Sequence, residues 1–466
     1  MGRIGASLSG IERALLNQLA ASQDAVEIGG FRLATGKSIN AAADNPSRFV
    51  ALSNFETQLV GVNAALSNVT VASSVGSQTQ LTVDQIRTEL NTIRTKALAD
   101  VDQALTSEER TANQAAIDAA ITAINELTRT EVSGRRYLDG SADFQYADVV
   151  NSEVSDVQAF TLGGASSLSV SGTVSVAAEQ ATLTHTEGTG LITNDATITI
   201  TGSRGSASVS VTTGESLATV ATRVNQEAYL TGVTATVDGN DLDFTTIDYG
   251  SNASLSITTS DTFNGAGSAT GVDAQATINS QSLTGDGNRF TLADSGANVA
   301  VEFAAGHSGA FTTFTISGTP PLFALTTDLS RTTEFAVRGA QAARLGGLSG
   351  TLDQLATGGT AAGLDTNSSL AVRIVDEALD DLDLIEGQVD AFADIAVASA
   401  GALLDAMQDS LEDTIDEVGG IDETAESVLL ARNQALADNA IAALAILDQQ
   451  RSSIVGLIQQ IAGLAH

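Results

Sequence analysis

Cysteine is absent from this sequence and histidine is rare, so two of the side chains that most often act as nucleophiles or hold transition metals are scarce. Its 466 residues include no cysteine, which excludes disulfides, zinc–thiolate sites, iron–sulfur clusters and cysteine nucleophiles. The three histidines, His185, His307 and His466, do not favour a multi-histidine metal site. His307 precedes Ser308 but lies outside the G-x-S-x-G frame of a hydrolase nucleophile. We therefore expect no catalytic, cofactor-binding or metal-binding residues and no enzymatic activity.

Two short segments contain the residue types of calcium loops, namely 285–288 (Gly-Asp-Gly-Asn) and 238–241 (Asp-Gly-Asn-Asp). Neither has the alternating oxygen ligands and the distal glutamate that such a loop needs. Asp-Gly sequences also tolerate the positive φ of a tight turn. The sequence therefore predicts a hairpin turn at each segment rather than a cation site.

The formal net charge is −35, and the acidic residues are concentrated away from the N-terminus. Residues 1–140 carry 12 basic and 15 acidic side chains, residues 141–345 carry 6 and 20, and residues 346–466 carry 3 and 21. A nucleic-acid-binding protein needs a basic face for its phosphate contacts, and this sequence provides none. Anionic membrane surfaces are disfavoured for the same reason.

The sequence also gives no sign of a secretory leader or a membrane span. Met1–Ser22 has Arg3, Glu12 and Arg13 at amphipathic spacing, without the apolar stretch and small-residue cleavage site of a secretory signal. Ile454–Ala465 is too short, and too interrupted by glutamine, to cross a bilayer. We expect a cytoplasmic protein, or one exported by a route without a cleaved signal, and no membrane partner.

Apolar residues at helical spacing dominate the first 130 residues. The first four, spaced 4, 3 and 4 apart as in a coiled-coil seam, are Ile4, Leu8, Ile11 and Leu15. After an interruption near residues 34–46, a second long helix is expected from about Pro46 to Ala99, because proline suits the first helical turn. A third helix is expected over about 107–131, with Ser107 and Glu109 forming its cap.

The helical period returns from about Leu370 to the C-terminus. Gly419-Gly420 is expected to divide this zone into two long helices that are acidic on their outer faces. Their apolar stripes, each spaced 3, 4 and 3, are Leu382, Ile385, Val389 and Phe392, and Ile454, Leu457, Ile461 and Leu464. We interpret the acidic run 376–386 as a solvated helix face.

Between about residues 140 and 333, alternation of apolar and polar residues replaces the helical period. The segment 233–246, with Asp238-Gly239 near its centre, predicts a hairpin, and one helix is expected over 215–228. The fold class is therefore α + β: long terminal helices form a coiled-coil-like rod, and an inserted Ser/Thr-rich β region holds one or two domains. Apolar seams this long must pair with each other or with other copies of the chain, which indicates self-association.

Residues at the interruptions of the helices resemble motifs of the bacterial flagellin family. Arg32–Asn40 (RLATGKSIN), followed by Ala43–Pro46 (ADNP), resembles the R-L-S-T-G-x-x-I-N … D-D-P segment of flagellins. Ser133–Ser141 (SGRRYLDGS) is similar to the N-G-K-K-L-L-D-G-S that closes their N-terminal helical region. Ile421–Thr424 resembles the acidic segment before their last helix, and Ala442–Ile458 resembles that helix itself.

The resemblance covers roughly residues 1–141 and 370–466, in the family's order, and it extends to the insert. The segment 276–290 (ATINSQSLTGDGNRF) resembles the I-N repeats of flagellar axial proteins. Gly214–Val224 with its following hairpin resembles a diverged earlier copy. These likenesses imply two outer repeats, at about 190–262 and 272–330.

The resemblance also implies a division into five segments and a set of assembly contacts. We expect an N-terminal helical filament-core segment at 1–45 and a helical rod segment at 46–140. The outer β-rich insert is expected at 141–345. A second helical rod segment is expected at 346–420, and a second filament-core segment at 421–466. Self-assembly contacts are expected at Ile4, Leu8, Ile11, Leu15, Leu33, Ile39, Asn40, Ile454, Leu457, Ile461 and Leu464. We expect the loop 35–46 to be a subunit interface as well as a turn, with Asp44 capping the helix that begins at Pro46.

The function that the resemblance implies is structural: a subunit that self-assembles through its terminal helices into the extracellular filament of the bacterial flagellum, for swimming motility. The alternative is a hook–filament junction protein, which shares the terminal helices and the export route. Implied partners are other copies of the chain in a helical polymer, the flagellar export apparatus and chaperone, and the cap and junction proteins. A third alternative, an enzyme carried in the insert, lacks the H-E-x-x-H of zincin-like inserts.

Two further expectations concern particular surfaces. The family's immune-recognition pattern R-V-R-E-L falls on residues 92–96, where only Ile93 and Arg94 match, so recognition by the vertebrate flagellin receptor is not expected. In a filament, C-terminal regions with 3 basic and 21 acidic side chains would stack beside their copies and repel one another. Either each acidic helix pairs with an N-terminal helix, or the filament needs salt or divalent cations.

Overall fold

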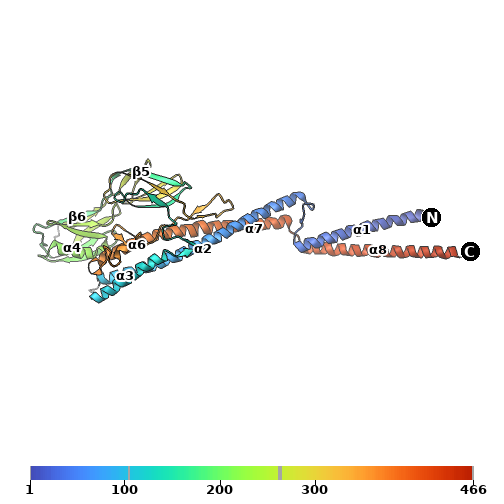
Figure 1. The fold of residues 1–466 in the computed structure, drawn as a ribbon, viewed down its shortest axis with the longest axis horizontal. Coiled ribbons are helices and arrows are strands. Elements are labelled where there is room, and N and C mark those ends of the chain that lie inside the picture. The colour runs from blue at the N-terminus through green and yellow to red at the C-terminus, as the bar shows by residue number, and fades with distance from the viewer. Residues whose placement is uncertain (1, 103–104, 261–264, 464–466) are drawn as a thin grey trace. The chain divides into compact units, whose positions relative to one another are not determined.

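The computed structural model describes residues 2–102, 105–260 and 265–463, and it has the predicted α + β fold (Figure 1). The chain forms two compact units, of which unit 1 comprises Met1–Ser67 and Ala402–His466, and unit 2 comprises Asn68–Gly401. The helices are α1 Gly2–Thr35, α2 Pro46–Asp102, α3 Ser107–Leu127, α4 Leu217–Gln226, α5 Ala228–Thr231, α6 Leu364–Asp390, α7 Ala398–Gly419 and α8 Glu423–Gly463, with a 3-10 helix η1 Leu352–Leu355 and a π-helix η2 Ala391–Val397. The long terminal helices and the break at Gly419-Gly420 are confirmed.

Unit 1 is a helical unit that brings the two ends of the chain together. Helices α1 and α8 run side by side and antiparallel (Figure 1). Ion pairs of 3.8 Å join Arg32 to Glu426 and Glu12 to Arg451 near the two ends of this pair. At the end of α7, a Cβ on Gly419 would lie only 3.0 Å from the Leu52 side chain of α2, so glycine permits this close approach.

In unit 2, the remainder of α2 pairs with α6 along a seam of buried residues spaced three and four apart, as in a coiled coil. On α2 the buried positions include Val75, Thr79, Val83, Ile86, Leu90, Ile93 and Ala97. On α6 and the start of η2 they are Ala371, Val375, Ala378, Leu382, Ile385, Val389 and Phe392. The predicted stripe from Leu382 to Phe392 is therefore confirmed, and its partner is a helix of the same chain.

The acidic run 376–386 is not a solvated helix face, and that interpretation was wrong. Arg94 Nε donates to Asp376 Oδ1 at 2.6 Å, and Arg87 donates to both Asp383, at 2.6 Å, and Glu386. These arginines project from α2, so the acidic C-terminal helix is paired with an N-terminal helix within unit 2. The sequence pattern could not show this, because the partners lie almost 300 residues away along the chain.

Helix α3 begins with a capping box, one residue earlier than expected. The Thr106 hydroxyl accepts from the Glu109 amide, and the Glu109 carboxylate accepts from the Thr106 amide, so Thr106 rather than Ser107 is the cap. The predicted stripe on this helix is confirmed at Ile117, Ile121 and Ile124, which are all buried.

The inserted β region contains two separate hydrophobic cores. One core lies between the sheets β6-β10-β9 and β12-β11-β7-β8 and helix α4. Its strands are β6 Thr182–Thr186, β7 Ala196–Thr201, β8 Ser206–Val211, β9 Val233–Asp238, β10 Asp241–Thr246, β11 Ser254–Thr259 and β12 Gly267–Thr270.

The other core lies between the sheets β14-β13-β5-β17-β3 and β15-β16-β4. Some of its strands precede the first core in the sequence and the others follow it. Its strands are β3 Gln145–Ala147, β4 Val154–Leu162, β5 Ser167–Val176, β13 Gln275–Ile278, β14 Gln281–Thr284, β15 Arg289–Asp294, β16 Ala297–Phe303 and β17 Gly309–Ser317. Short pairs complete the region: β1 Glu131–Val132 with β2 Arg135–Arg136, β18 Leu322–Phe323 with β19 Thr333–Glu334, and β20 Gly346–Gly347 with β21 Gly350–Thr351.

Both calcium-like segments are turns, as predicted. Strands β9 and β10 pair with Asp238 opposite Asp241, and the turn between them uses Gly239 at φ 62°. At the other segment, Asp286 bridges Arg289 around Gly287, at φ 58°. The helix expected over 215–228 is also present, although it divides into α4 and α5 at Glu227.

Within the described residues, two helices are long and apolar enough to cross a membrane by length and composition, Pro46–Val101 and Glu423–Gln460. The expectation that no segment meets this criterion was therefore wrong. Alanine contributes much of the hydropathy of 423–460. Soluble helices also pass this test, so it gives weak support for a membrane location. None of the tested window in α8 is buried, which leaves its apolar side chains uncovered.

A buried charged node joins strand β4 to helix α6 inside unit 2. The Arg338 guanidinium binds both carboxylate oxygens of Asp156, at 2.9 and 3.0 Å, and lies 3.5 Å from Asp381 on α6. Asp143 lies beside the same cavity of about 590 Å³, paired with Arg344 at 3.5 Å. Burial raises the pKa of Asp143 and of Asp381 to about 6, despite the neighbouring arginines.

The π-helix η2 faces a glycine of α2 at the closest approach of the two helices. A Cβ on Gly76 would lie 2.8 Å from Cβ of Ala393, nearer than side-chain carbons pack. The neighbouring residue, Phe392, stacks on Phe335 at 4.1 Å between ring centroids and also contacts Phe323. The π-turn therefore places one residue against α2 and directs the next into an aromatic cluster.

Replacing Gly76 by alanine is expected to destabilise unit 2 by about 1–3 kcal/mol, because the added methyl group collides with Ala393. Urea unfolding followed by circular dichroism measures the change. Gly387→Ala on α6 is the matched control: a Cβ there meets nothing within 4 Å, so that variant should gain about 0.5–1 kcal/mol. Equal stability of the two variants would contradict the close approach.

Asp381→Asn is expected to change how stability depends on pH. Because the folded-state pKa of Asp381 is about 6, above the ordinary 3.8, the folded chain binds this proton more tightly than the unfolded chain. Relative to the variant, the native chain should therefore lose up to about 3 kcal/mol as the pH rises from 4 to 7. Urea unfolding across this range tests the difference. Asp383→Asn, at a side chain that is 61% exposed, is the control, and parallel profiles for D381N and the native chain would refute the prediction.

Candidate assembly interface

The contact between α1 and α8 is built from small and medium side chains at coiled-coil spacing. On α1 the half-buried or buried positions are Leu15, Leu19, Ser22, Val26, Gly29 and Leu33, at intervals of four and three residues. On α8 they include Leu430, Asn433, Ala437, Ala440, Leu444 and Leu447, at the same intervals. A Cβ on Gly29 would lie 3.5 Å from the Leu430 side chain, so the two backbones are close. The seam therefore buries little apolar surface per residue.

Many of the large apolar side chains of these two helices instead lie exposed. On α1 they are Ile11, Leu16, Ile28 and Phe31. On α8 they are Val428, Leu429, Ile441, Ile446, Ile454, Val455, Leu457 and Ile458. Scattered apolar residues are normal on a surface, but this many exposed large apolar side chains on one pair of helices suit contacts with other molecules. We name these side chains the outer faces of α1 and α8.

The predicted assembly residues divide between the seam and the outer faces. Ile11, Ile454 and Leu457 lie on the outer faces, with 52%, 48% and 62% of each residue exposed. Leu15 and Leu33 are half-buried seam positions. Three predicted residues lie in helices whose side chains there are not described, namely Ile4, Leu8 and Ile461. Leu464 lies outside the described residues.

The other two predicted residues, Ile39 and Asn40, lie in the loop that connects α1 to α2. The backbone amide and the hydroxyl of Ser38 both donate to the carbonyl oxygen of Gly419, at 2.6 and 3.0 Å. Lys37 pairs with Gly420 in a β-bridge, and its Nζ lies 2.6 Å from Glu56. Ile39 is buried. The loop is thus fixed to the joint between α7 and α8 within unit 1.

Asp44 organises this loop but does not cap α2, so that prediction was wrong. Its Oδ2 accepts hydrogen bonds from the backbone amides of Asn40 and Ala41, both at 2.9 Å. These bonds lower the pKa of Asp44 below its ordinary value. The cap of α2 is Asn45, whose Oδ1 accepts from the Arg48 amide at 3.2 Å. Both residues are capping types, and the sequence alone could not distinguish their roles.

The two matched positions of the immune-recognition pattern are engaged within unit 2. Ile93 is completely buried in the seam of α2 and α6, so its side chain is not available to a receptor. Arg94 binds Asp376 at 2.6 Å. These contacts give both residues a structural role in the helical pair.

The part of α7 in unit 1 carries a charge pattern that sequence reasoning did not single out. Its carboxylates are Asp405, Asp409, Glu412, Asp413, Asp416 and Glu417, with no basic residue between them. None forms an ion pair with another described residue. Pairing with N-terminal arginines therefore accounts for the acidic run of α6 but not for that of α7.

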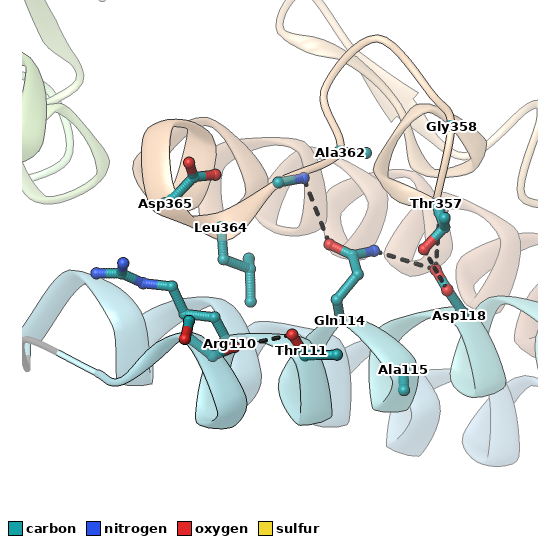
Figure 2. Close-up of a pocket in the computed structure, with 12 residues that line it drawn as sticks. Arg110, Thr111, Gln114, Ala115, Asp118, Thr357, Gly358, Ala362, Leu364 and Asp365 are labelled. Atoms are coloured by element: carbon teal, nitrogen blue, oxygen red, sulfur yellow. Dashed lines mark hydrogen bonds between the residues drawn. The ribbon is translucent and has the colours of Figure 1, made fainter.

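Unit 2 has a pocket of about 560 Å³ between α3 and the segment leading to α6, and Figure 2 shows its lining. Gln114 donates to the Leu355 carbonyl oxygen at 2.8 Å, and Asp118 accepts from the amide and hydroxyl of Thr357 at 2.9 and 2.6 Å. Burial opposes the charged form of Asp118, but the bonds from Thr357 and Gln114 hold its pKa below the ordinary value. These groups satisfy one another, so they fix the loop on α3. Among the described residues, no cluster of three or more acidic or histidine side chains has metal-site geometry.

Asp44→Ala is expected to loosen the loop between α1 and α2, because two backbone amides lose their acceptor. Hydrogen exchange at Asn40 and Ala41 should accelerate by roughly three- to tenfold. In the native chain the protection should persist at pH 4 and disappear only as the pH falls through the lowered pKa of Asp44. Mass spectrometry of exchanged peptides measures both effects. Asp405→Ala, at an exposed carboxylate on α7, is the control, and similar exchange in both variants would contradict this role.

Comparison with known proteins finds a family match for the N-terminal helices. Residues 9–143 match the model of the bacterial flagellin N-terminal helical region. No curated protein sequence matches the chain. Similar solved structures include the D2-D3 domains of the flagellar cap protein FliD from Escherichia coli, at 19% identity and a TM-score of 0.27 over 38% of this chain and 99% of that one.

A second similar structure is Xanthomonas campestris FlgL, at 9% identity and a TM-score of 0.28 over 78% of this chain and 99% of that one. A third is flagellar hook associated protein-3 from Legionella pneumophila, at 12% identity and a TM-score of 0.24 over 85% of this chain and 99% of that one. Likenesses with TM-scores this low do not define a function. The family match rests on sequence, and it spans α1, α2, α3 and the SGRRYLDGS segment that follows them. Residues 9–143 of this chain therefore form an N-terminal helical region of the bacterial flagellin type.

Proposed function

We propose that this chain is a structural subunit of the bacterial flagellar filament, which self-assembles through its terminal helices into an extracellular helical polymer for swimming motility. The observation that carries the proposal is the exposure of the large apolar residues of α1 and α8. The fully buried positions of the seam between these helices are small residues, namely Ser22, Gly29, Ala437 and Ala440, whereas its leucines are only half-buried. Isoleucine, leucine and phenylalanine side chains remain in water until another molecule covers them.

The size of the uncovered surface supports a polymer contact. Fully burying one large aliphatic side chain is worth about 1.5–3 kcal/mol, and α8 alone exposes eight such residues. The described side chains of residues 451–460 are all exposed, so this end of α8 gains no cover within the chain. Identical subunits that repeat along an axis could cover these faces continuously.

Unit 2 suits a surface position in such a polymer. Its strands alternate buried apolar residues with exposed serine and threonine, as in β7 and β8, and its charged node and pocket are internally satisfied. This supports a non-enzymatic role. Because residues 9–143 match the flagellin N-terminal region, we propose the export apparatus and its chaperone, together with the cap and junction proteins, as the other partners.

The alternative is a hook–filament junction protein, which has the same kind of terminal helices but is used in few copies. The two functions differ in whether the chain continues to add to itself. Purified chain, with flagellar seeds, should therefore grow into long regular tubes, as seen by negative-stain electron microscopy. A chain that stays monomeric, under conditions in which a control flagellin polymerises, would favour the junction protein.

The double variant Ile454→Ser/Leu457→Ser should slow seeded elongation at least tenfold, because it removes two exposed apolar side chains from the proposed contact. Light scattering gives the rate, and electron microscopy gives the length of the tubes. Leu329→Ser is the matched control, since Leu329 is 75% exposed but lies outside the terminal helices. Equal slowing by the control, or normal growth of the double variant, would exclude this face from assembly.

A further inference from the structure

A groove in unit 1 combines exposed apolar side chains with a mainly acidic rim, whose one arginine, Arg32, is paired with Glu426 at 3.8 Å. It lies beside the C-terminal part of α1 and the loop that follows, and it has a volume of about 510 Å³. Ile28 and Phe31 supply the apolar surface, with 48% and 58% of each residue exposed. Asp24 and Glu27 flank it, and neither forms an ion pair or hydrogen bond with another described residue. A matching occupant must therefore offer an apolar side chain next to a cation.

The N-terminal half of α1 presents this combination. Leu16 is half exposed, and Arg13 is exposed and forms no ion pair with any described residue. At 3.6 residues per turn, Arg13, Leu16, Asp24, Ile28 and Phe31 fall within about a third of the circumference of α1. This sector lies roughly opposite the seam with α8. One side of α1 thus carries Arg13 and Leu16 in its N-terminal half. In its C-terminal half the same side carries Asp24 and Phe31.

The two complementary patches cannot meet within one chain, because they lie at different heights on one straight helix. A second copy shifted by twelve residues, about 18 Å along the axis, would bring its Leu16 level with Ile28. The same shift places the Arg13 of that copy next to Asp24. Each copy then offers one patch to the copy ahead and the other patch to the copy behind.

We propose that the groove beside Ile28 and Phe31 receives the Arg13–Leu16 face of α1 from a second copy of the chain, in a parallel, head-to-tail contact. This inference rests on the proposed filament function and specifies the partner of one assembly surface. A contact between two different patches does not close on itself, so it generates an open polymer. The charged rim fixes direction and register, and the apolar side chains supply the buried area.

Reversing the charges tests the complementarity. Arg13→Glu, and separately the double variant Asp24→Arg/Glu27→Arg, should each slow seeded elongation about tenfold or more. Combining all three substitutions should restore the rate to within a few-fold of the native chain. Arg48→Glu is the matched control, because Arg48 is an exposed arginine of unit 1 without an ion pair to a described residue. Slowing by R48E but not by R13E, or no rescue in the combined variant, would overturn the proposal.

Disulfide trapping tests the geometry independently of filament growth, because the native chain has no cysteine. The double variant Leu16→Cys/Ile28→Cys, oxidised at high concentration, should give a ladder of linked oligomers on a non-reducing gel. Each single variant should give little cross-linking. If cross-linking of the double variant stopped at a dimer, the head-to-tail contact would be wrong, and the result would indicate a closed antiparallel contact instead.

The two proposals fail in different ways in this experiment. A ladder without filaments would keep the contact and exclude the filament subunit. Normal filaments of the native chain, together with no cross-link in the double variant, would keep the filament subunit and exclude this contact. Absence of both would overturn both proposals.

Discussion

The pairing of helices from opposite ends of the chain is the interaction on which the rest of the structure depends. A long amphipathic helix is not stable alone in water, and its apolar stripe has to be covered. In unit 2, α2 supplies this cover for α6, and in unit 1, α1 supplies it for α8. Because both partners lie far apart in the sequence, the insert between α3 and α6 must leave and return at nearby points. The antiparallel sheets satisfy this condition, since their strands run out and back.

The two helical pairs solve the same problem with opposite distributions of large residues. The α2–α6 seam buries Ile86, Leu90, Leu382 and Ile385, and arginines on α2 neutralise the acidic face of α6. That pair is complete within one chain. The α1–α8 seam buries serine, glycine and alanine instead, and it leaves isoleucine, leucine and phenylalanine outside. The pair is therefore stabilised fully only when further molecules cover those faces, which is the physical basis for proposing assembly.

Periodicity predicted the helices and the α6 stripe, because local spacing alone determines which residues share a face. Turn chemistry likewise predicted the hairpin at Gly239 and the turn at Gly287. The errors concern long-range partners: the run 376–386 looked solvated because Arg87 and Arg94 are remote in sequence. Asn45 caps α2 in place of the predicted Asp44, because the backbone conformation of the loop decides which of two adjacent capping residues reaches the first helical turn. Spacing also marked Leu15 and Ile454 alike, although one lies in the seam and the other on an outer face. Whether such a residue is covered within the chain depends on the helix that packs beside it, which local spacing does not reveal.

Charge provides the last constraint on how such chains can meet. Five carboxylates of α6, namely Asp376, Glu377, Asp381, Asp383 and Glu386, lie within ion-pair distance of arginines of unit 2, so they need less counter-charge from a neighbouring molecule. Those of α7 in unit 1 are not paired with described residues, and like charges on stacked copies repel unless they are screened or matched. The exposed cation Arg13 of the same unit forms no ion pair with a described residue. A parallel, staggered arrangement brings cations of one copy toward carboxylates of another. An in-register arrangement would instead set like charges side by side, so electrostatics favours the staggered polymer.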